Sequence, residues 1–347
     1  MPDTSLIPPD MQLAESTPKP NRRKALWYGA LFAAVQISSL VFLFWLGGTQ
    51  WFLLHNAYPK SREAGYSIRA TGMNCDVVLY GDSSALTGLD PAIIQAKTGL
   101  KTCNLSEPIY VHTGVGSEFP LDYYLAHNVR PKYLVTMMSA TGFNPDITPL
   151  TTFSPEGIAF ALNYDQGSWL WKGLLQRPQW LIWFIEYVGQ QLDKEAAWEL
   201  SGTNAEHWKV DERKRRDADA GLWLYPYPPQ TKCGRVLETP GFSHEESQVG
   251  VGNFRNRYAV GGTKVLIDVT PSADCDPSDA LYSQVTAGLT DNKLEFRPIR
   301  EFCEGDVHPS VEGTIRISNE VAGQILTLVR QDAEGQQTKN SSEKPSP

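Results

Sequence analysis

The chain has 347 residues, of which 41% are hydrophobic and 20% are charged, so it can bury a sizeable core in one or two domains. Its net charge of −8 argues against a nucleic-acid-binding protein, because neutralising phosphates requires a basic surface. The tight basic cluster Lys214-Arg215-Arg216 is flanked by acidic residues, and we interpret it as solvated surface.

A long apolar segment near the N-terminus predicts a transmembrane helix. From Ala25 to Gly48 no residue is charged, and this length spans about 30 Å of hydrocarbon as a helix. A cleaved signal peptide is the weaker alternative, because the segment is longer than a usual signal core and no Ala-x-Ala site follows. The positive-inside rule then predicts a single-pass membrane protein with a cytoplasmic N-terminus and a periplasmic or otherwise extracytoplasmic main domain. Basic residues precede the segment, and aromatic residues suit its two interfaces: Lys19, Arg22, Arg23, Lys24; Trp27, Tyr28, Trp45, Trp51.

The two ends of the chain lack apolar periodicity. Residues 1–24 and 332–347 are polar and rich in Pro, Gln, Ser and Lys, so we expect disordered tails. With the apolar segment at 25–48 and a linker at 49–69, this leaves residues 70–331 for the globular domain.

Alternating strands and helices follow the linker. Short apolar runs predict strands at 76–80, 101–105, 133–138 and 263–269. Asp90-Pro91 and Gly99 bound a first helix, a second covers about 116–128, and a third covers about 310–330. This order predicts an α/β fold of three layers, with a parallel sheet covered by helices on both faces. The last helix carries an apolar stripe for the core: Ile315, Ile317, Val321, Ile325, Leu328.

An insertion of about 110 residues, at 145–255, separates the third and fourth strands. It contains seven of the ten tryptophans. A packed helical lid, an aromatic platform for sugar rings and a helix at the membrane interface are all compatible with this composition, since indole suits both wet and dry surroundings.

The five cysteines all follow the apolar segment, where an oxidising compartment favours disulfides. Their spacing contains no Cys-x-x-Cys and resembles no zinc site. Cys75 and Cys103 open neighbouring strands and could form a bridge. Cys275 and Cys303 both lie in loops near one sheet edge, which leaves Cys233 unpaired; buried free thiols are the alternative.

Two short motifs could together form a nucleophilic serine site. The first strand ends in Gly81-Asp82-Ser83-Ser84, which places a hydroxyl at the carboxyl edge of the sheet, where open α/β sheets bind ligands. Asp306 and His308 follow some 220 residues later, just before the last helix. A serine, an imidazole and a carboxylate are the parts of a catalytic triad. Asp82 is expected to stabilise the serine turn, and Ser84 is a rival nucleophile.

Together these residues resemble the SGNH/GDSL hydrolase superfamily, over residues 70–330 without the insertion. Gly81-Asp82-Ser83 is similar to its first block, and Asp306/His308 to its last. Gly88-Leu89-Asp90-Pro91 is similar to the Leu-x-Pro helix start of a membrane-anchored branch of the superfamily. This branch includes alginate O-acetylation and teichoic-acid D-alanylation proteins. The resemblance implies a three-layer, flavodoxin-like domain. It also implies Ser83 as the nucleophile, His308 as its base and Asp306 as the residue that orients the imidazole.

The chain departs from the superfamily pattern at three places. Asp306 precedes His308 by two residues instead of three, although the alginate-acetylation relatives share this spacing. Ser106-Glu107-Pro108 stands where a glycine is expected, and Asn144 is a loose match to the expected asparagine. Ser106, Asn144 and His112 are therefore candidates for oxyanion or substrate contacts. Losing one oxyanion donor lowers turnover about 10²–10³-fold.

The sequence favours a serine esterase or O-acyltransferase that acts on acyl esters of a cell-envelope or exported polysaccharide, with an acyl-donor membrane protein as a potential partner. The alternative is a catalytically silent accessory protein that binds glycan in a polysaccharide modification or export complex. The sequence contains no Walker loop, no Gly-x-Gly-x-x-Gly and no metal-ligand cluster, so we expect no cofactor and no metal.

Overall fold

The computed structural model divides the chain into two compact units, with the boundary between Leu43 and Phe44. The residues that it describes are 22–55, 65–68, 70–107, 118–139, 142, 155–201, 221–222, 229–233, 243–275, 284, 286–289, 291, 294, 298–304 and 308–342. The expected tail at 1–24 lies almost entirely outside this set.

Helix α1 (Arg22–Gly47) forms the described part of the first unit, and its last turn belongs to the second. The helix is long and apolar enough to cross a membrane, as predicted for residues 25–48. Its side chains are exposed up to Phe42. Exposed apolar residues along a whole helix are typical of a segment whose solvent is lipid.

The second unit contains a four-stranded parallel sheet of β1 (Val77–Gly81), β2 (Thr102–Asn104), β3 (Tyr133–Met138) and β4 (Lys264–Val269). Its order is β2-β1-β3-β4. These strands confirm the predicted ones to within two residues at each end. The order places a topological switch point between β1 and β3, because the chain leaves β1 toward β2 on one side and continues from β3 to β4 on the other. Ligands bind at such a point in open α/β sheets.

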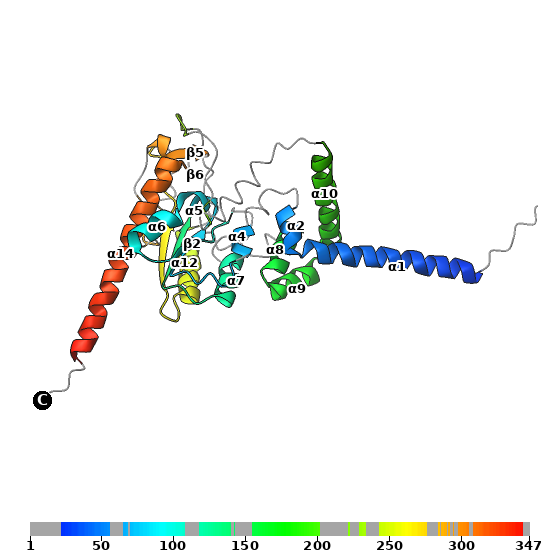
Figure 1. Ribbon diagram of the computed structural model, residues 1–347, viewed down its shortest axis with the longest axis horizontal. Coiled ribbons are helices and arrows are strands. Elements are labelled where there is room, and N and C mark those ends of the chain that lie inside the picture. Colours follow the sequence, from blue (N-terminus) through cyan, green and yellow to red (C-terminus); the bar gives the residue numbers. More distant parts are fainter. Residues whose placement is uncertain are drawn as a thin grey trace, which may run out of the picture. The chain divides into compact units, whose positions relative to one another are not determined.

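Helices cover both faces of the sheet, which makes the three expected layers (Figure 1). On one face, α6 (Pro91–Thr98) and α14 (Val311–Ser342) pack against the side chains of Val77 and Leu79. On the other, α7 (Phe119–His127) and α12 (His244–Tyr258) pack against Val78 and Tyr80. Successive strand residues point to opposite faces, so the apolar run of β1 serves both cores.

Local sequence explains where the helices begin and end. Asp90 caps α6 by accepting from the backbone N–H groups of Ala92 and Ile93, and Gly99 ends the helix in the left-handed conformation at φ 69°. Ser243 and Glu246 form a capping box at the start of α12. These caps act through hydrogen bonds within a few residues of each helix end.

Helix α14 differs from the prediction in length and in one buried position. It continues to Ser342, beyond the boundary expected at 331, and Asp332 anchors the extension by accepting from the hydroxyl of Tyr133 at 2.9 Å and from Lys264. Ile317, Val321 and Ile325 are buried as expected, whereas Ile315 is exposed. The helix packs through the polar side chains of Thr314 and Ser318 at its first turns, which turns Ile315 away from the core.

Short helices replace part of the expected linker at 49–69. They are α2 (Gln50–His55), which buries Phe52 and Leu53, and α4 (Gly65–Ile68). Within the insertion, α8 (Pro155–Asn163), α9 (Gly167–Gln176) and α10 (Gln179–Ser201) lie between β3 and α12. Helices α8, α9 and α10 each bury apolar side chains, and they pack against one another.

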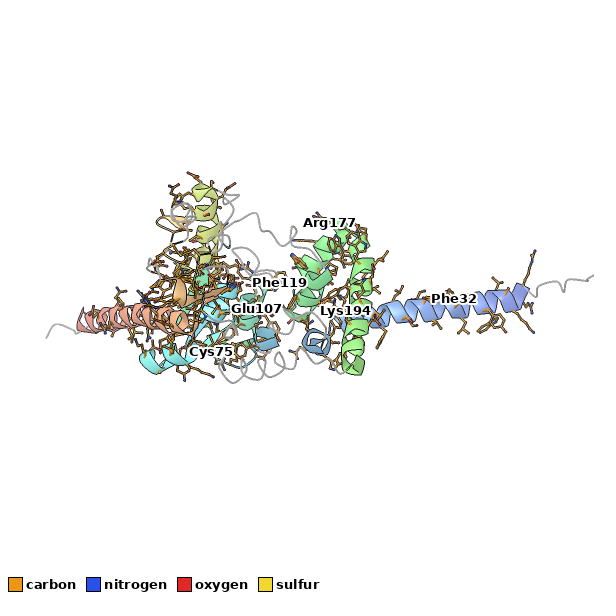
Figure 2. All side chains as sticks on the ribbon, turned by 90° about the horizontal axis from the view of Figure 1, so that it is seen from above. Phe32, Cys75, Glu107, Phe119, Arg177 and Lys194 are labelled. Atoms are coloured by element: carbon orange, nitrogen blue, oxygen red, sulfur yellow. A yellow bond between two sulfur atoms is a disulfide. The ribbon has the colours of Figure 1, made fainter. Side chains whose placement is uncertain are left out.

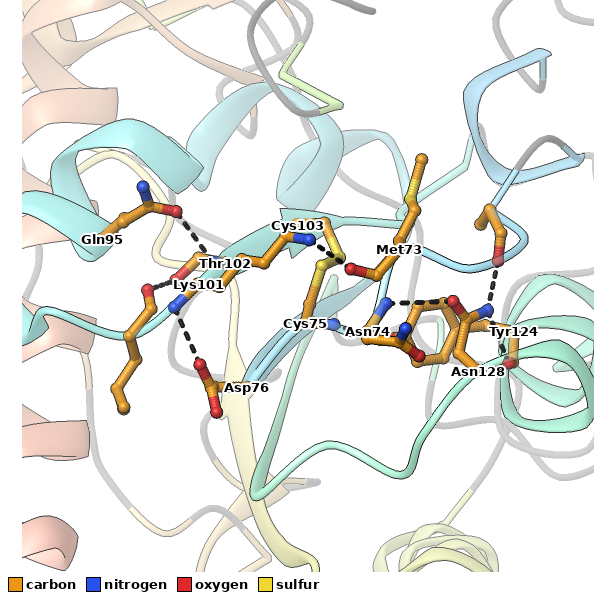
Figure 3. Close-up of a disulfide and its surroundings, with 12 residues drawn as sticks. Met73, Asn74, Cys75, Asp76, Gln95, Lys101, Thr102, Cys103, Tyr124 and Asn128 are labelled. Carbon is orange, nitrogen blue, oxygen red and sulfur yellow. Dashed lines mark hydrogen bonds between the residues drawn. A yellow bond between two sulfur atoms is a disulfide. The ribbon is translucent and has the colours of Figure 1, made fainter.

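Two disulfides cross-link the second unit. Cys75–Cys103 joins the starts of β1 and β2, as expected, beside a set of hydrogen bonds that includes Lys101 to Asp76 (Figure 3). The expected bridge between Cys275 and Cys303 is wrong, because Cys275 is bonded to Cys233. Cys303 lies on strand β5 (Phe302–Glu304) and is buried.

Candidate active site

Ser83 stands at a sharp turn from β1 into the short helix α5 (Ser83–Gly88). The turn depends on Gly81, whose φ is +158° and whose hydrogen points at the backbone of β3. A Cβ at this position would lie 1.8 Å from the carbonyl oxygen of Met137. Glycine is therefore required for Ser83 to leave the sheet at this angle.

Asp82 holds this turn with both of its carboxylate oxygens. Oδ1 accepts from the backbone N–H of Ser84 at 3.0 Å and from its hydroxyl at 2.5 Å. Oδ2 accepts from the backbone N–H of Ser139 at 2.7 Å and from its hydroxyl at 2.6 Å. Because Ser139 directly follows β3, this buried carboxylate ties the end of β1 to the end of β3. The predicted structural role of Asp82 is confirmed.

Ser84 belongs to the same hydrogen-bond network. Its hydroxyl also bonds to that of Thr270, which directly follows β4. Ser84 is 1% exposed, so its hydroxyl faces the protein interior and is not placed as a nucleophile. Sequence reasoning missed Ser139 and Thr270, although each could have been found as a hydroxyl residue directly after a predicted strand.

His308 comes from a separate segment, a small antiparallel hairpin of β5 and β6 (His308–Pro309). Three features hold this hairpin and the following helix α14 against α5 and Asp90. Gly88 allows close approach of Pro309, whose Cγ would lie 2.9 Å from a Cβ at that position. The hydroxyl of Thr314 donates to the carbonyl of Thr87 at 2.8 Å, and that of Ser318 accepts from the backbone N–H of Asp90 at 2.8 Å.

This packing brings the two distant motifs together. The Nε2 atom of His308 lies 2.9 Å from the hydroxyl oxygen of Ser83, which is hydrogen-bonding distance. Both residues are only partly buried, unlike Asp82 and Ser84 beside them. A hydroxyl in contact with an imidazole can transfer its proton as it attacks an electrophile, which is the chemistry of a serine nucleophile.

The other predicted site residues are not all placed. Asp306, Asn144 and His112 lie outside the described residues, so their roles stay predictions. Ser106 follows β2 at the correct edge but is fully buried, and its backbone N–H donates to Oδ1 of Asn104 at 3.0 Å. Asn104 in turn donates to the carbonyls of Ala85 and Leu89, so it braces α5 from the neighbouring strand.

Glu107 is a further buried carboxylate at this edge. Its backbone N–H donates to the carbonyl of Gly81 at 3.0 Å, and its side chain accepts from the hydroxyl of Ser67 in α4. The hydroxyl of Ser67 also lies 2.5 Å from that of Tyr164, which follows α8. Glu107 therefore connects the strand end beside Ser83 to the segment after α1 and to the insertion.

Asp268 is a fully buried carboxylate on β4, in register with Met137. Burial raises its pKa to about 8, and the nearby carboxylate of Asp291 acts in the same direction. Asp268 is the next-to-last residue of β4, and through Met137 it is level with Gly81 at the end of β1. Within the described ranges, no three His, Cys, Asp or Glu side chains are grouped so that they could hold a metal ion.

Comparisons of the chain with protein-family models, with curated proteins and with solved structures find no match.

Proposed function

We propose that the chain is a membrane-anchored serine hydrolase of the SGNH type, which cleaves or transfers acyl groups held in ester linkage. The observation that carries this proposal is the 2.9 Å distance between Ser83 Oγ and His308 Nε2. Two residues 225 positions apart meet at the carboxyl edge of a parallel sheet, beside its topological switch point.

The reaction proceeds in two halves. Ser83 Oγ attacks the ester carbonyl carbon while its proton passes to His308 Nε2, and the tetrahedral intermediate then expels the alcohol, which takes that proton. This leaves an acyl group on Ser83. Water, or a hydroxyl of a second acceptor, next attacks the acyl carbon and gives its proton to His308, which returns it to Ser83. Water gives an esterase, and a polysaccharide hydroxyl gives an O-acyltransferase.

The buried hydrogen bonds around Asp82 support this role, because they hold the turn that carries Ser83 and do not use the hydroxyl of Ser83. Asp82 receives four hydrogen bonds from Ser84 and Ser139, and none of these uses the hydroxyl of Ser83. A positioned nucleophile lowers the barrier by reducing the freedom that must be lost on reaction. In the proposal, Asp306 orients the imidazole of His308, and the backbone N–H of Ser83 is one oxyanion donor.

Helix α1 supports an envelope substrate over a small soluble ester. As a single-pass anchor with a cytoplasmic N-terminus, it holds the second unit on the extracytoplasmic side, next to polymers made or exported at the membrane. An acyl ester of such a polysaccharide is the proposed substrate, and an acyl-donor membrane protein is the proposed partner for transfer.

A serine-directed fluorophosphonate probe tests the proposal on the full chain in detergent. We expect labelling of the wild type, none of Ser83→Ala, and labelling at least about 100-fold slower for His308→Gln, because general-base catalysis contributes that much. Ser168→Ala, which removes an exposed serine of α9, is the matched control and should be labelled like the wild type. Equal labelling of Ser83→Ala, or none of a folded wild type, contradicts the proposal.

A catalytically silent glycan-binding accessory protein is the second candidate. The burial of Ser106 and the use of its backbone N–H by Asn104 favour it, because neither group of Ser106 then faces a substrate oxyanion. This candidate predicts an unlabelled wild type. It also predicts that Ser83→Ala restores the cellular function of a strain that lacks the chain as fully as the wild type does.

A further inference from the structure

The turn between α9 and α10 exposes several large apolar side chains. Trp171 and Leu175 of α9 are 64% and 65% exposed, and Ile182 and Trp183 of α10 are 68% and 47% exposed. All four lie within 13 consecutive residues, 171–183. Large apolar side chains that gather on the surface of a soluble domain indicate an interaction site. We call these four residues the apolar turn.

Another side of α10 packs against the end of α1. The rings of Phe184 and Phe44 meet edge to face at 5.6 Å, and a Cβ on Gly47 would lie 2.5 Å from the side chain of Val188. Tyr187 contacts Phe52 of α2 in the same way at 6.0 Å. Phe184, Tyr187 and Val188 are buried and share one face of α10, whereas Ile182 and Trp183 are exposed.

These contacts locate the apolar turn along the chain's path out of a membrane. Phe44 and Gly47 belong to the last turn of α1, which is where a spanning helix reaches the bilayer surface. Trp45 and Trp51 flank this point and are 62% and 52% exposed. Tryptophan is the residue that accumulates at the level of the lipid headgroups.

The charge of the segment fits an anionic lipid surface. Between Asp165 and Glu186 the charged residues are Lys172 and Arg177 alone, so this stretch carries two positive charges. Both side chains are exposed, and Arg177 lies directly between α9 and α10 (Figure 2). Exposed apolar side chains interleaved with basic ones are typical of segments that lie in the membrane interface.

We propose that the apolar turn inserts into the interfacial layer of the bilayer that α1 crosses. Its indole and aliphatic side chains enter the region between headgroups and acyl chains, while Lys172 and Arg177 contact lipid phosphates. This second attachment rests on the proposed anchoring by α1. It holds the sheet domain in a fixed orientation to the membrane surface, where a single helix alone would let it rotate.

Spin labels on single added cysteines test the insertion in the full chain, reconstituted in phosphatidylcholine vesicles that contain one third phosphatidylglycerol. The labels are placed at Ile182, at Val35 in α1 as a marker of anchoring, and at Asp193, an exposed residue of α10, as a control. The unsubstituted chain gives the background from the native thiols. The measurement compares collision with oxygen, which dissolves in lipid, with collision with a water-soluble nickel chelate.

We expect the ratio of oxygen to nickel collisions at Ile182 to be several-fold higher than at Asp193 and lower than at Val35. The charge reversals Lys172→Glu and Arg177→Glu together should lower the ratio at Ile182. Lys194→Glu is the matched control on α10 and should leave it unchanged (Figure 2).

Several outcomes overturn the insertion. If Ile182 is as exposed to nickel as Asp193 while Val35 is shielded, the insertion is wrong and the anchor stands. If Val35 is also exposed to nickel, the proposed anchor fails as well. Shielding of Ile182 from both reagents indicates contact with protein instead. Shielding that appears only when polysaccharide is added indicates a sugar platform.

Discussion

The two halves of the candidate dyad are held by different physical means. Ser83 rises from the sheet on a turn fixed by a glycine that tolerates no side chain and by four hydrogen bonds to buried Asp82. His308 sits on a two-residue strand, held by the packing of Pro309 on Gly88 and by contacts of α14. The turn that carries Ser83 is therefore fixed from within the core, whereas His308 is attached to the surface of the core. Substitutions on the serine side should cost stability, whereas those on the histidine side should cost reactivity.

The largest effect is expected at Gly81. Gly81→Ala combines an unfavourable φ of +158° with a clash against the carbonyl of Met137, so we expect a loss of about 3 kcal/mol or more in the free energy of unfolding. Denaturant unfolding measures it. Gly72→Ala is the control, because its φ is +71° but nothing lies within 4 Å, and it should lose about 1 kcal/mol. Similar losses of stability in Gly81→Ala and Gly72→Ala would show that the contact between Gly81 and the backbone of β3 does not restrict this position.

The next effect is expected at Asp82. Asp82→Ala leaves the buried N–H of Ser84 and the partly buried N–H of Ser139 without their acceptor, at a cost of about 3 kcal/mol. Asp90→Ala is matched to it, because Asp90 also caps a helix but is only partly buried, and it should lose about 1 kcal/mol. Thermal unfolding compares them. A cost at Asp82 no greater than at Asp90 would mean that the serine turn is not held by the core.

A pH-dependent effect is expected at Asp268, which belongs to the sheet but not to the dyad. Its pKa is about 8 in the folded protein and near 3.8 in the unfolded chain, so the folded state retains a proton that the unfolded state has lost between these values. Stability therefore falls as the pH rises through this window, by at most about 1.4 kcal/mol per pH unit.

Asp268→Asn removes this titration. Its free energy of unfolding, relative to the wild type, should increase between pH 5 and pH 8, and probe labelling of Ser83 should stay unchanged. Urea unfolding at the two pH values measures the difference. A constant difference would show that the folded protein does not hold Asp268 protonated in this pH range.

The smallest effect on stability is expected on the histidine side. Gly88→Ala places a methyl group 2.9 Å from Pro309, which must shift and carry His308 away from Ser83. We expect a loss of about 1 kcal/mol in stability, the low end for overpacking, and a large drop in the rate of probe labelling. Gly323→Ala on α14 meets nothing within 4 Å, so it should gain about 1 kcal/mol and be labelled normally. Equal labelling of both variants would refute the packing argument.

The sequence predicts the sheet well because each strand is a short apolar run between turn residues. The ends of α6 are predicted equally well, because Asp90-Pro91 and Gly99 act through local backbone conformation and hydrogen bonds. The extension of α14 is missed because nothing apolar marks it; it depends on contacts of Asp332 with Tyr133 and Lys264, which come from other elements.

The site is predicted less completely. Ser83 and His308 are recognisable as motifs, but the spacing of 225 residues says nothing about distance in space. Ser139 and Thr270 each directly follow a predicted strand, but the strand order β2-β1-β3-β4 decides that they meet Asp82 and Ser84. The pairing of Cys275 with Cys233 likewise depends on loop paths that carry no periodic signal.

The disulfide between Cys75 and Cys103 has a consequence for where the chain could be active. It closes a ring of polypeptide, 28 residues in separation, that contains Ser83, and such a closure contributes about 3–4 kcal/mol. A whole domain is stable by only about 5–15 kcal/mol. In a reducing compartment this ring would stay open and the β1–β2 pair that leads into Ser83 would be weakened. The turn that carries Ser83 should therefore be most stable where disulfides persist.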